Sequence, residues 1–123
     1  MTRTVKDLIA NKPLICTVPD KSVRETAQLM LDKGVSAVVV LEAGKLLGIF
    51  SERDALRIFV ATRRNADLTN VGTVMTRDPV TIPADTTITA AKALMAEKNF
   101  RHLPVIEGDT VLGVVSLRAV ALD

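Results

Sequence analysis

A short segment whose side chains suit a phosphorylated sugar occurs twice in this chain. It reads GIFSERD from Gly48 to Asp54 and GVVSLRA from Gly113 to Ala119, 65 positions later. Ser51 stands where a helix is predicted to begin, so its hydroxyl and the first amides of that helix could bind a phosphate. Asp54 could accept hydrogen bonds from both hydroxyls of a ribose, and Arg53 adds a cation suited to phosphate. These residue types indicate nucleotide chemistry.

The same residues also have a purely structural explanation. Ser-x-x-Asp at a helix start is a variant of the capping box, in which two side chains satisfy the free amides of the first turn. The second segment begins a helix at Ser116 but has Ala119 where the first has Asp54. Because capping need not differ between the two segments, this difference favours a ligand-binding role for Asp54. Both explanations stay open.

The two segments belong to a repeat that fills the chain. Matching residues lie 64 to 66 positions apart, among them Pro13 and Pro79, Pro19 and Pro83, Met30 and Met95, and Leu47 and Leu112. A repeat of this length indicates one duplicated supersecondary unit. We predict a first repeat over residues 1–62, a polar, turn-prone linker over 63–70 and a second repeat over 71–123. Each half is near the size where a lone core becomes marginal, so the halves should fold against each other.

Each repeat is predicted to contain a short strand, a helix, a hairpin and a second helix. In the first repeat these are a strand over 14–18, a helix opened by Ser22 and Glu25 and stopped at Gly34, strands over 37–41 and 46–50, and a helix from Ser51 to Ala61 or Thr62. In the second they are a strand over 80–82, a helix capped by Thr86 or Thr87, strands over 103–106 and 111–115, and a helix from Ser116. The expected fold class is α/β, with helices packed between two small sheets about an internal pseudo-twofold axis.

Composition excludes several classes of protein. Apolar residues make up 48% and charged residues 24%, as in folded soluble proteins, and no apolar run could span a bilayer. We expect a cytoplasmic protein without a membrane partner, since no secretory signal is visible. The net charge of only +2 and the presence of only three aromatic residues, all phenylalanines, argue against nucleic-acid binding. One small basic patch, Arg57, Arg63 and Arg64, keeps it as a third hypothesis.

Catalytic and metal-binding patterns are equally scarce. Cys16 is the only cysteine and is interpreted as a small apolar residue beside a strand. His102 is the only histidine and has no companion ligands, so no metal site is expected. The sequence contains no nucleophile–base pair and no phosphate-binding glycine loop. We therefore expect no enzyme.

Four features together resemble a tandem CBS-domain pair, or Bateman module. They are the GIFSERD-type ending, the strand Arg101–Ile106, the lead-in Val74-Met75-Thr76 and the spacing near 65. The resemblance covers essentially the whole chain. It implies a non-enzymatic sensor that binds adenosine nucleotides or related adenosyl ligands in clefts between the repeats and forms homodimers. It also implies no catalytic cofactor, with AMP, ADP or ATP as the regulatory ligand.

The resemblance further implies which residues would share each cleft. The first site would combine Ser51, Arg53 and Asp54 with Val80, Thr81, Arg101, His102 and Pro104 of the other repeat. There Val80 and Pro104 could sandwich the base. The second site would combine Ser116, Arg118 and Ala119 with Ile15, Cys16, Ser36, Ala37 and Val39, and is expected to be degenerate because it lacks the carboxylate, the basic pair and the proline. The alternative is a ligand-free dimerisation scaffold whose partner is another protein.

Overall fold

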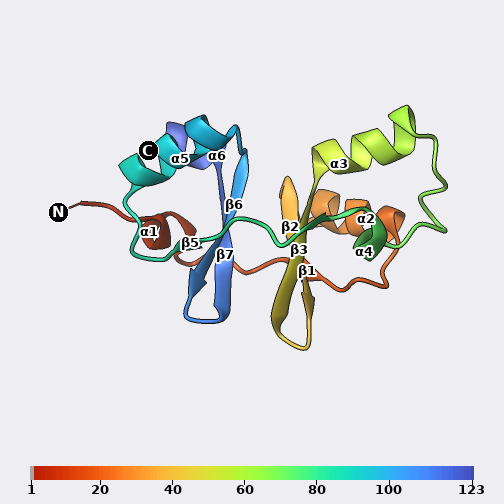
Figure 1. Cartoon of the computed structure of the whole chain (residues 1–123), viewed down its shortest axis with the longest axis horizontal. Coiled ribbons are helices and arrows are strands. Elements are labelled where there is room, and N and C mark those ends of the chain that lie inside the picture. The colour runs from red at the N-terminus through yellow and green to blue at the C-terminus, as the bar shows by residue number, and fades with distance from the viewer. Residues whose placement is uncertain (1) are drawn as a thin grey trace. The chain divides into compact units, whose positions relative to one another are not determined.

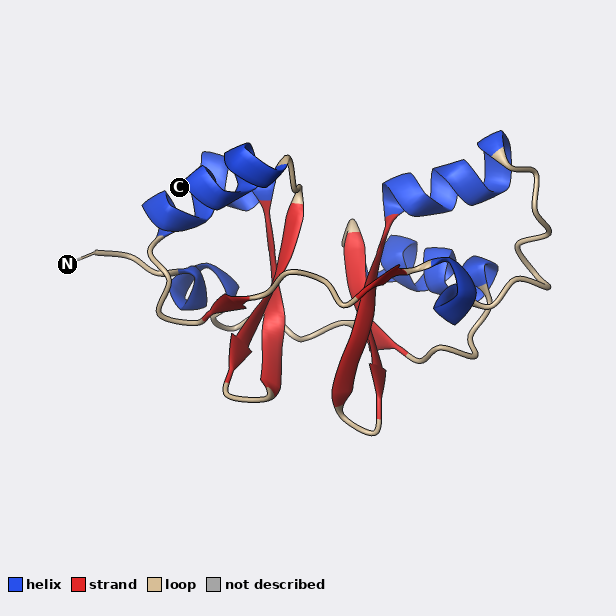
Figure 2. Cartoon of the chain, in the orientation of Figure 1, coloured by secondary structure: helices blue, strands red, loops and turns tan. Residues whose placement is uncertain are grey.

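The computed structural model describes residues 2–123 and divides into two compact units (Figure 1). The central unit is the continuous stretch Ile15–Pro79. The terminal unit joins the segment that ends at Leu14 to the stretch Val80–Asp123. Each unit combines helices with one small sheet, which confirms the predicted mixed α/β class (Figure 2).

The central unit is built on a four-stranded sheet. Its elements are β1 (Cys16–Thr17), α2 (Val23–Lys33), β2 (Ala37–Glu42), β3 (Lys45–Ser51), α3 (Glu52–Leu56), the π-helix η1 (Arg57–Ala61), α4 (Val71–Val74) and β4 (Thr76–Arg77). The strand order is β1-β2-β3-β4; β1 and β2 are parallel and the other pairs antiparallel.

The terminal unit follows the same plan with three strands. Its elements are α1 (Val5–Ile9), β5 (Ile82–Pro83), α5 (Ile88–Lys98), β6 (His102–Glu107), β7 (Thr110–Ser116) and α6 (Leu117–Ala121). The strand order is β5-β6-β7, with β5 parallel to β6 and β6 antiparallel to β7. In both units the pairing of the hairpin is identical once 65 is added to each number: Ala37 faces Ser51, and His102 faces Ser116.

Local signals at the helix ends behave as predicted. The Ser22 hydroxyl accepts from the Glu25 amide, and the Ser22 amide donates to the Glu25 carboxylate at 3.1 Å, which lowers the pKa of Glu25. Gly34 ends α2 in the left-handed conformation at φ 65°. Thr87, rather than Thr86, caps α5, because its hydroxyl accepts from the Ala90 amide.

Three predicted elements differ in extent or kind, and two helices were not predicted. The first strand of each repeat is only two residues long, so Val80 and Thr81 precede β5 rather than forming it. The helix after Ser51 changes at Arg57 into a π-helix, in which the Thr62 amide donates to the Arg57 carbonyl at 2.9 Å. The short helices α1 and α4 lie outside the elements predicted from sequence.

The segment that leads into each repeat packs against the body of the other repeat. The Val5 amide donates to the Thr86 carbonyl at 2.9 Å in the terminal unit. The equivalent bond in the central unit joins the Val71 amide to the Lys21 carbonyl at 2.8 Å. The compact units are therefore not divided at the linker that the repeats suggest, residues 63–70, and the repeat boundaries remain a prediction of the sequence.

Each unit has its own apolar core. The segments that lead into the two repeats, around α1 and α4, help to fill these cores and are called the exchanged segments below. In the terminal unit, Val5 and Ile9 pack in one cluster with Ile82, Ala84, Ile88, Ala91, Met95, Leu103, Val105, Val115 and Val120. In the central unit, Val71 and Met75 belong to the cluster of Val23, Met30, Val38, Val40, Phe50, Ala55, Ile58 and Ala66. Met30 and Met95, which match between the repeats, are both buried.

The glycines that open the two repeated segments lie close to the lead-in segments, Gly48 to Met75 and Thr76, and Gly113 to Ile9. A Cβ atom on Gly48 would lie 2.6 Å from both the Met75 sulfur and the Thr76 carbonyl oxygen. A Cβ atom on Gly113 would lie 3.2 Å from the nearest Ile9 methyl. Glycine is required at Gly48 because backbone, not only side chain, occupies the space a Cβ would need.

Within residues 2–123, we find no helix with the length and apolar character needed to cross a bilayer.

Candidate functional site

Ser51 and Asp54 form a complete capping box at the start of α3. The Ser51 amide and hydroxyl both donate to Asp54 Oδ2 at 2.9 Å, and the Asp54 amide donates back to the Ser51 hydroxyl at 3.2 Å. The structural explanation for this pair is thus confirmed. A ligand-binding role for the same residues stays a prediction.

The amides at the start of α3 are largely in use. Those of Ser51 and Asp54 serve the capping box, and the Glu52 amide donates to the Ser36 carbonyl at 2.9 Å. α3 is also only five residues long. Few amides at the start of α3 therefore remain available to a phosphate.

Arg57 holds the remaining oxygen of Asp54. Its guanidinium donates to Asp54 Oδ1 at 2.8 Å, while 54% of the Arg57 side chain and 14% of the Asp54 side chain are exposed. The sequence placed Arg57 only in a basic patch. Its spacing of three residues from Asp54 on a predicted helix was the signal that could have identified this salt bridge.

The second segment has the same cap without the carboxylate. The Ser116 hydroxyl accepts from the Ala119 amide at 3.1 Å, and the Leu117 amide donates to the Arg101 carbonyl at 2.7 Å, as Glu52 does to Ser36. A serine alone is thus sufficient to cap α6. The carboxylate at Asp54 is an addition to that shared cap.

Replacing Ala119 by Asp should stabilise α6. A carboxylate in the first turn complements the helix dipole and can bond the cap, so we expect a gain of about 0.3–1 kcal/mol in the free energy of unfolding. Ala119→Asn, which adds a similar volume without charge, is the control in thermal denaturation. A lower melting temperature for Ala119→Asp than for Ala119→Asn would contradict this expectation.

The remaining residues of the first predicted site lie in the terminal unit. Val80 is 43% exposed and Thr81 is half-buried, both just before β5. Arg101 is exposed next to β6, His102 is half-buried at the start of that strand, and Pro104 is buried within it. The structure thus brings Arg101 and His102 beside the start of α6.

The residues of the second predicted site are divided in the same way. Ile15 is half-buried, and Cys16 is exposed in β1, where it pairs with Val39. Ser36 and Ala37 adjoin the start of α3. Ser116, Arg118 and Ala119 belong to the terminal unit. Each predicted site takes residues from both units, and its assembly remains a prediction.

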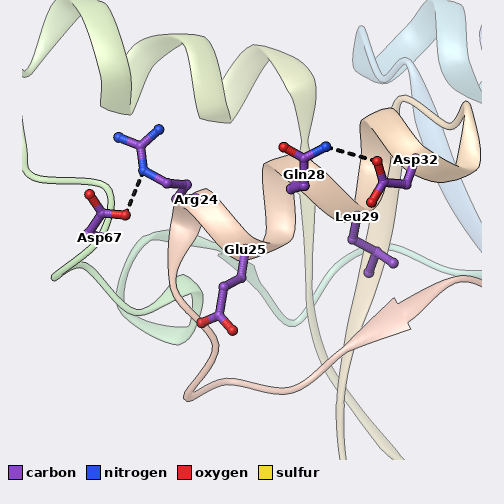
Figure 3. A pocket seen from close by; sticks show the side chains of 6 residues that line it. All are labelled: Arg24, Glu25, Gln28, Leu29, Asp32 and Asp67. Atoms are coloured by element: carbon purple, nitrogen blue, oxygen red, sulfur yellow. Dashed lines mark hydrogen bonds and ion pairs between the residues drawn. The ribbon is translucent and has the colours of Figure 1, made fainter.

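Two surface grooves flank α2 in the central unit. One, of about 480 Å³, is lined by Arg24, Glu25, Gln28, Leu29, Asp32 and Asp67 (Figure 3). The other, of about 360 Å³, is lined by Cys16, Thr17, Val18, Lys21, Glu25 and Leu29. Polar groups of the first groove mostly bind one another: Arg24 donates to Asp67 at 2.6 Å and Gln28 to Asp32 at 2.8 Å, as Figure 3 shows. These internal pairs leave the groove few free groups for a ligand.

The described part of the chain, residues 2–123, contains no group of three or more His, Cys, Asp or Glu side chains arranged to hold a metal ion.

The sequence model of the CBS domain matches residues 5–61 and 71–122. These two matches leave little of the chain uncovered. The chain belongs to the CBS domain family. It is a CBS domain pair, as the repeat and its motifs indicated.

Related proteins agree with this assignment. The mitochondrial CBS domain-containing protein CBSX3 of Arabidopsis thaliana is 32% identical over 126 residues, which cover 93% of this chain and 61% of CBSX3. CBSCBSPB5 of the same plant is 35% identical, but the match covers only 22% of it. The chain thus spans less than two thirds of the length of these relatives.

Solved structures share the fold of this CBS domain pair. The CBS-domain-containing protein ATU1752 from Agrobacterium tumefaciens has a TM-score of 0.88 and 31% identity, with 98% of each chain covered. The CBS domain pair of MJ0100, solved in complex with 5′-methylthioadenosine and S-adenosyl-L-methionine, has a TM-score of 0.87 and 22% identity, with 99% of this chain and 95% of that chain covered.

Proposed function

We propose that this CBS domain pair is a non-enzymatic regulatory module that binds one adenosine nucleotide of the AMP, ADP or ATP type. The observation that carries the proposal is the Asp54 carboxylate, which is present in one repeat and replaced by Ala119 in the other, although both helices are capped by a serine. Capping accounts for the two serines. It does not account for the difference between Asp54 and Ala119.

The proposed site uses the residues of the first predicted cleft. Asp54 would accept from the ribose, and Ser51 would position Asp54 through the capping box. Arg53, Arg101 and His102 would bind phosphate, because charge-assisted hydrogen bonds are the strong ones. Val80, Thr81 and Pro104 would surround the base. Both ligands of the MJ0100 complex contain adenosine, which supports the adenosine part of the proposal.

A thermal-shift panel tests the proposal directly. AMP, ADP, ATP, S-adenosylmethionine and NAD would each be added to the folded chain. A ligand present at 100 times its Kd should raise the free energy of unfolding by about 2.7 kcal/mol. No shift with any of the five would reject nucleotide binding.

Asp54→Asn should weaken binding of the nucleotide that the panel identifies. Loss of a charged hydrogen-bond acceptor should cost about 1.5–3 kcal/mol, or roughly ten- to a hundredfold in Kd, measured by calorimetry. Asparagine can still accept the amide of the capping box, so the fold should persist. Asp67→Asn, which removes an exposed carboxylate of the same unit, is the control. Equal Kd values for Asp54→Asn and wild type would remove Asp54 from the site.

A second candidate is a scaffold that acts by association with another protein or with its own copy. Exposed aliphatic side chains in the central unit favour it: Leu31 is 77%, Leu56 62% and Leu68 82% exposed. Exposed apolar side chains are typical of association surfaces where they form a contiguous patch. Sedimentation that depends on protein concentration, with no response to nucleotides, would favour the scaffold. The nucleotide-binding candidate would also be a homodimer, in the cytoplasm, so the response to nucleotides is what separates the two.

A further inference from the structure

The Asp54 carboxylate has too few free acceptor positions to receive a ribose while its present partners remain. It accepts three hydrogen bonds, two from Ser51 and one from Arg57. A carboxylate offers about four acceptor positions, and a ribose diol requires two of them. At least one of the present donors must therefore leave when the sugar binds.

Arg57 is the donor that leaves most easily. The two Ser51 donors belong to the capping box, and breaking them would also uncap α3. More than half of the Arg57 side chain, 54%, is exposed, so water can replace the carboxylate as the partner of the guanidinium. The Asp54–Arg57 pair also spans the point at which the α-helical hydrogen bonding of α3 changes to the π-helical hydrogen bonding of η1. The Arg57 amide bonds the carbonyls of Arg53 and Asp54, and its own carbonyl begins the π-helical turn.

We propose that Arg57 is a built-in competitor of the nucleotide sugar for Asp54, so that sugar binding opens the Asp54–Arg57 salt bridge and loosens η1. This inference rests on the proposed function of Asp54 and adds its regulation. Binding of the nucleotide at Asp54 would then change the stability of η1, because η1 begins at Arg57. π-helical turns of this kind often accompany functional sites.

The test is calorimetry with 5′-methylthioadenosine, which has the ribose diol but no phosphate. The absent phosphate matters because Arg57 could otherwise attract the ligand by charge alone. An exposed salt bridge of this type changes affinity by about two- to fivefold when it must be broken, so Arg57→Gln should lower the Kd by that factor. Arg64→Gln removes the same charge from an exposed site of the same unit and should leave the Kd unchanged.

Two further measurements separate the outcomes. In an Asp54→Asn background, Arg57→Gln should have no additional effect, because the charged pair is already lost. Amide exchange in η1 should accelerate on ligand addition in wild type but not in Arg57→Gln. If wild type binds and Arg57→Gln leaves the Kd unchanged or raises it, or if exchange in η1 does not respond, the competitor role is wrong while the proposed function stands. If wild type binds neither 5′-methylthioadenosine nor any compound of the thermal-shift panel, both fail.

Discussion

Val5→Ala combined with Ile9→Ala should unfold the terminal unit selectively, although most of that unit, Val80–Asp123, lies at the other end of the chain. Both side chains are buried in the core that includes Leu103 and Val115. Losing burial of two aliphatic side chains costs about 1.5–3 kcal/mol each, so we expect a loss of roughly 3–6 kcal/mol in the free energy of unfolding.

Amide hydrogen exchange is the measurement that locates this effect. Protection should fall first in β6 and β7 and persist longer in β2 and β3. Val18→Ala combined with Leu31→Ala is the control, because it shortens aliphatic side chains that are 41% and 77% exposed. That control should change stability by less than about 1 kcal/mol. Loss of protection in β2 and β3 before β6 and β7 would contradict the assignment of α1 to the terminal unit.

Gly48→Val should destabilise the central unit strongly, whereas Gly113→Val should be milder. A Cβ at Gly48 meets the Thr76 backbone oxygen at 2.6 Å, so β4 must move away from β3. We expect a cost of about 3 kcal/mol or more, at the upper end of overpacking effects. At Gly113 the nearest atom, 3.2 Å away, is the end of the Ile9 side chain, which can rotate aside.

Urea denaturation of the two valine variants measures the difference. The control is built into the pair, since the two glycines occupy matching positions of the repeat and receive the same substitution. For Gly113→Val the expected cost is about 1–2 kcal/mol. If both variants lost the same free energy of unfolding, the segment with Met75 and Thr76 would be packed less tightly against Gly48 than the structure indicates.

The main elements could be predicted because their signals are local. Ser22 with Glu25, Gly34 and Thr87 fix the ends of α2 and the start of α5 within a few residues of sequence. A continuous β-branched run at residues 38–40 marked β2, and the turns between strands marked the hairpins. The α/β class followed from the order in which these elements repeat. The family resemblance followed from the GIFSERD-type ending, the strand at residues 101–106, the lead-in at residues 74–76 and the spacing near 65.

The parts that could not be predicted depend on distant contacts. The five-residue helix α1 has little intrinsic stability, and its buried partners lie some eighty or more positions away in Ile88 and Val115. The exchange of lead-in segments is a property of tertiary packing that periodicity does not encode. At the candidate site, the capping box was visible in the sequence, but the competition of Arg57 for Asp54 required the position of its guanidinium.

The interleaved order of the two units has a consequence for how the protein is made. Translation finishes the central unit at Pro79, when everything that unit contains has been synthesised. The terminal unit can fold only after the stretch Val80–Asp123 has been synthesised. Its first segment must then pack against that stretch, which closes a loop containing the whole central unit, and the entropic cost of closing a loop rises only slowly with its length. Nascent chains on the ribosome should therefore acquire their folded state from the middle of the sequence outward.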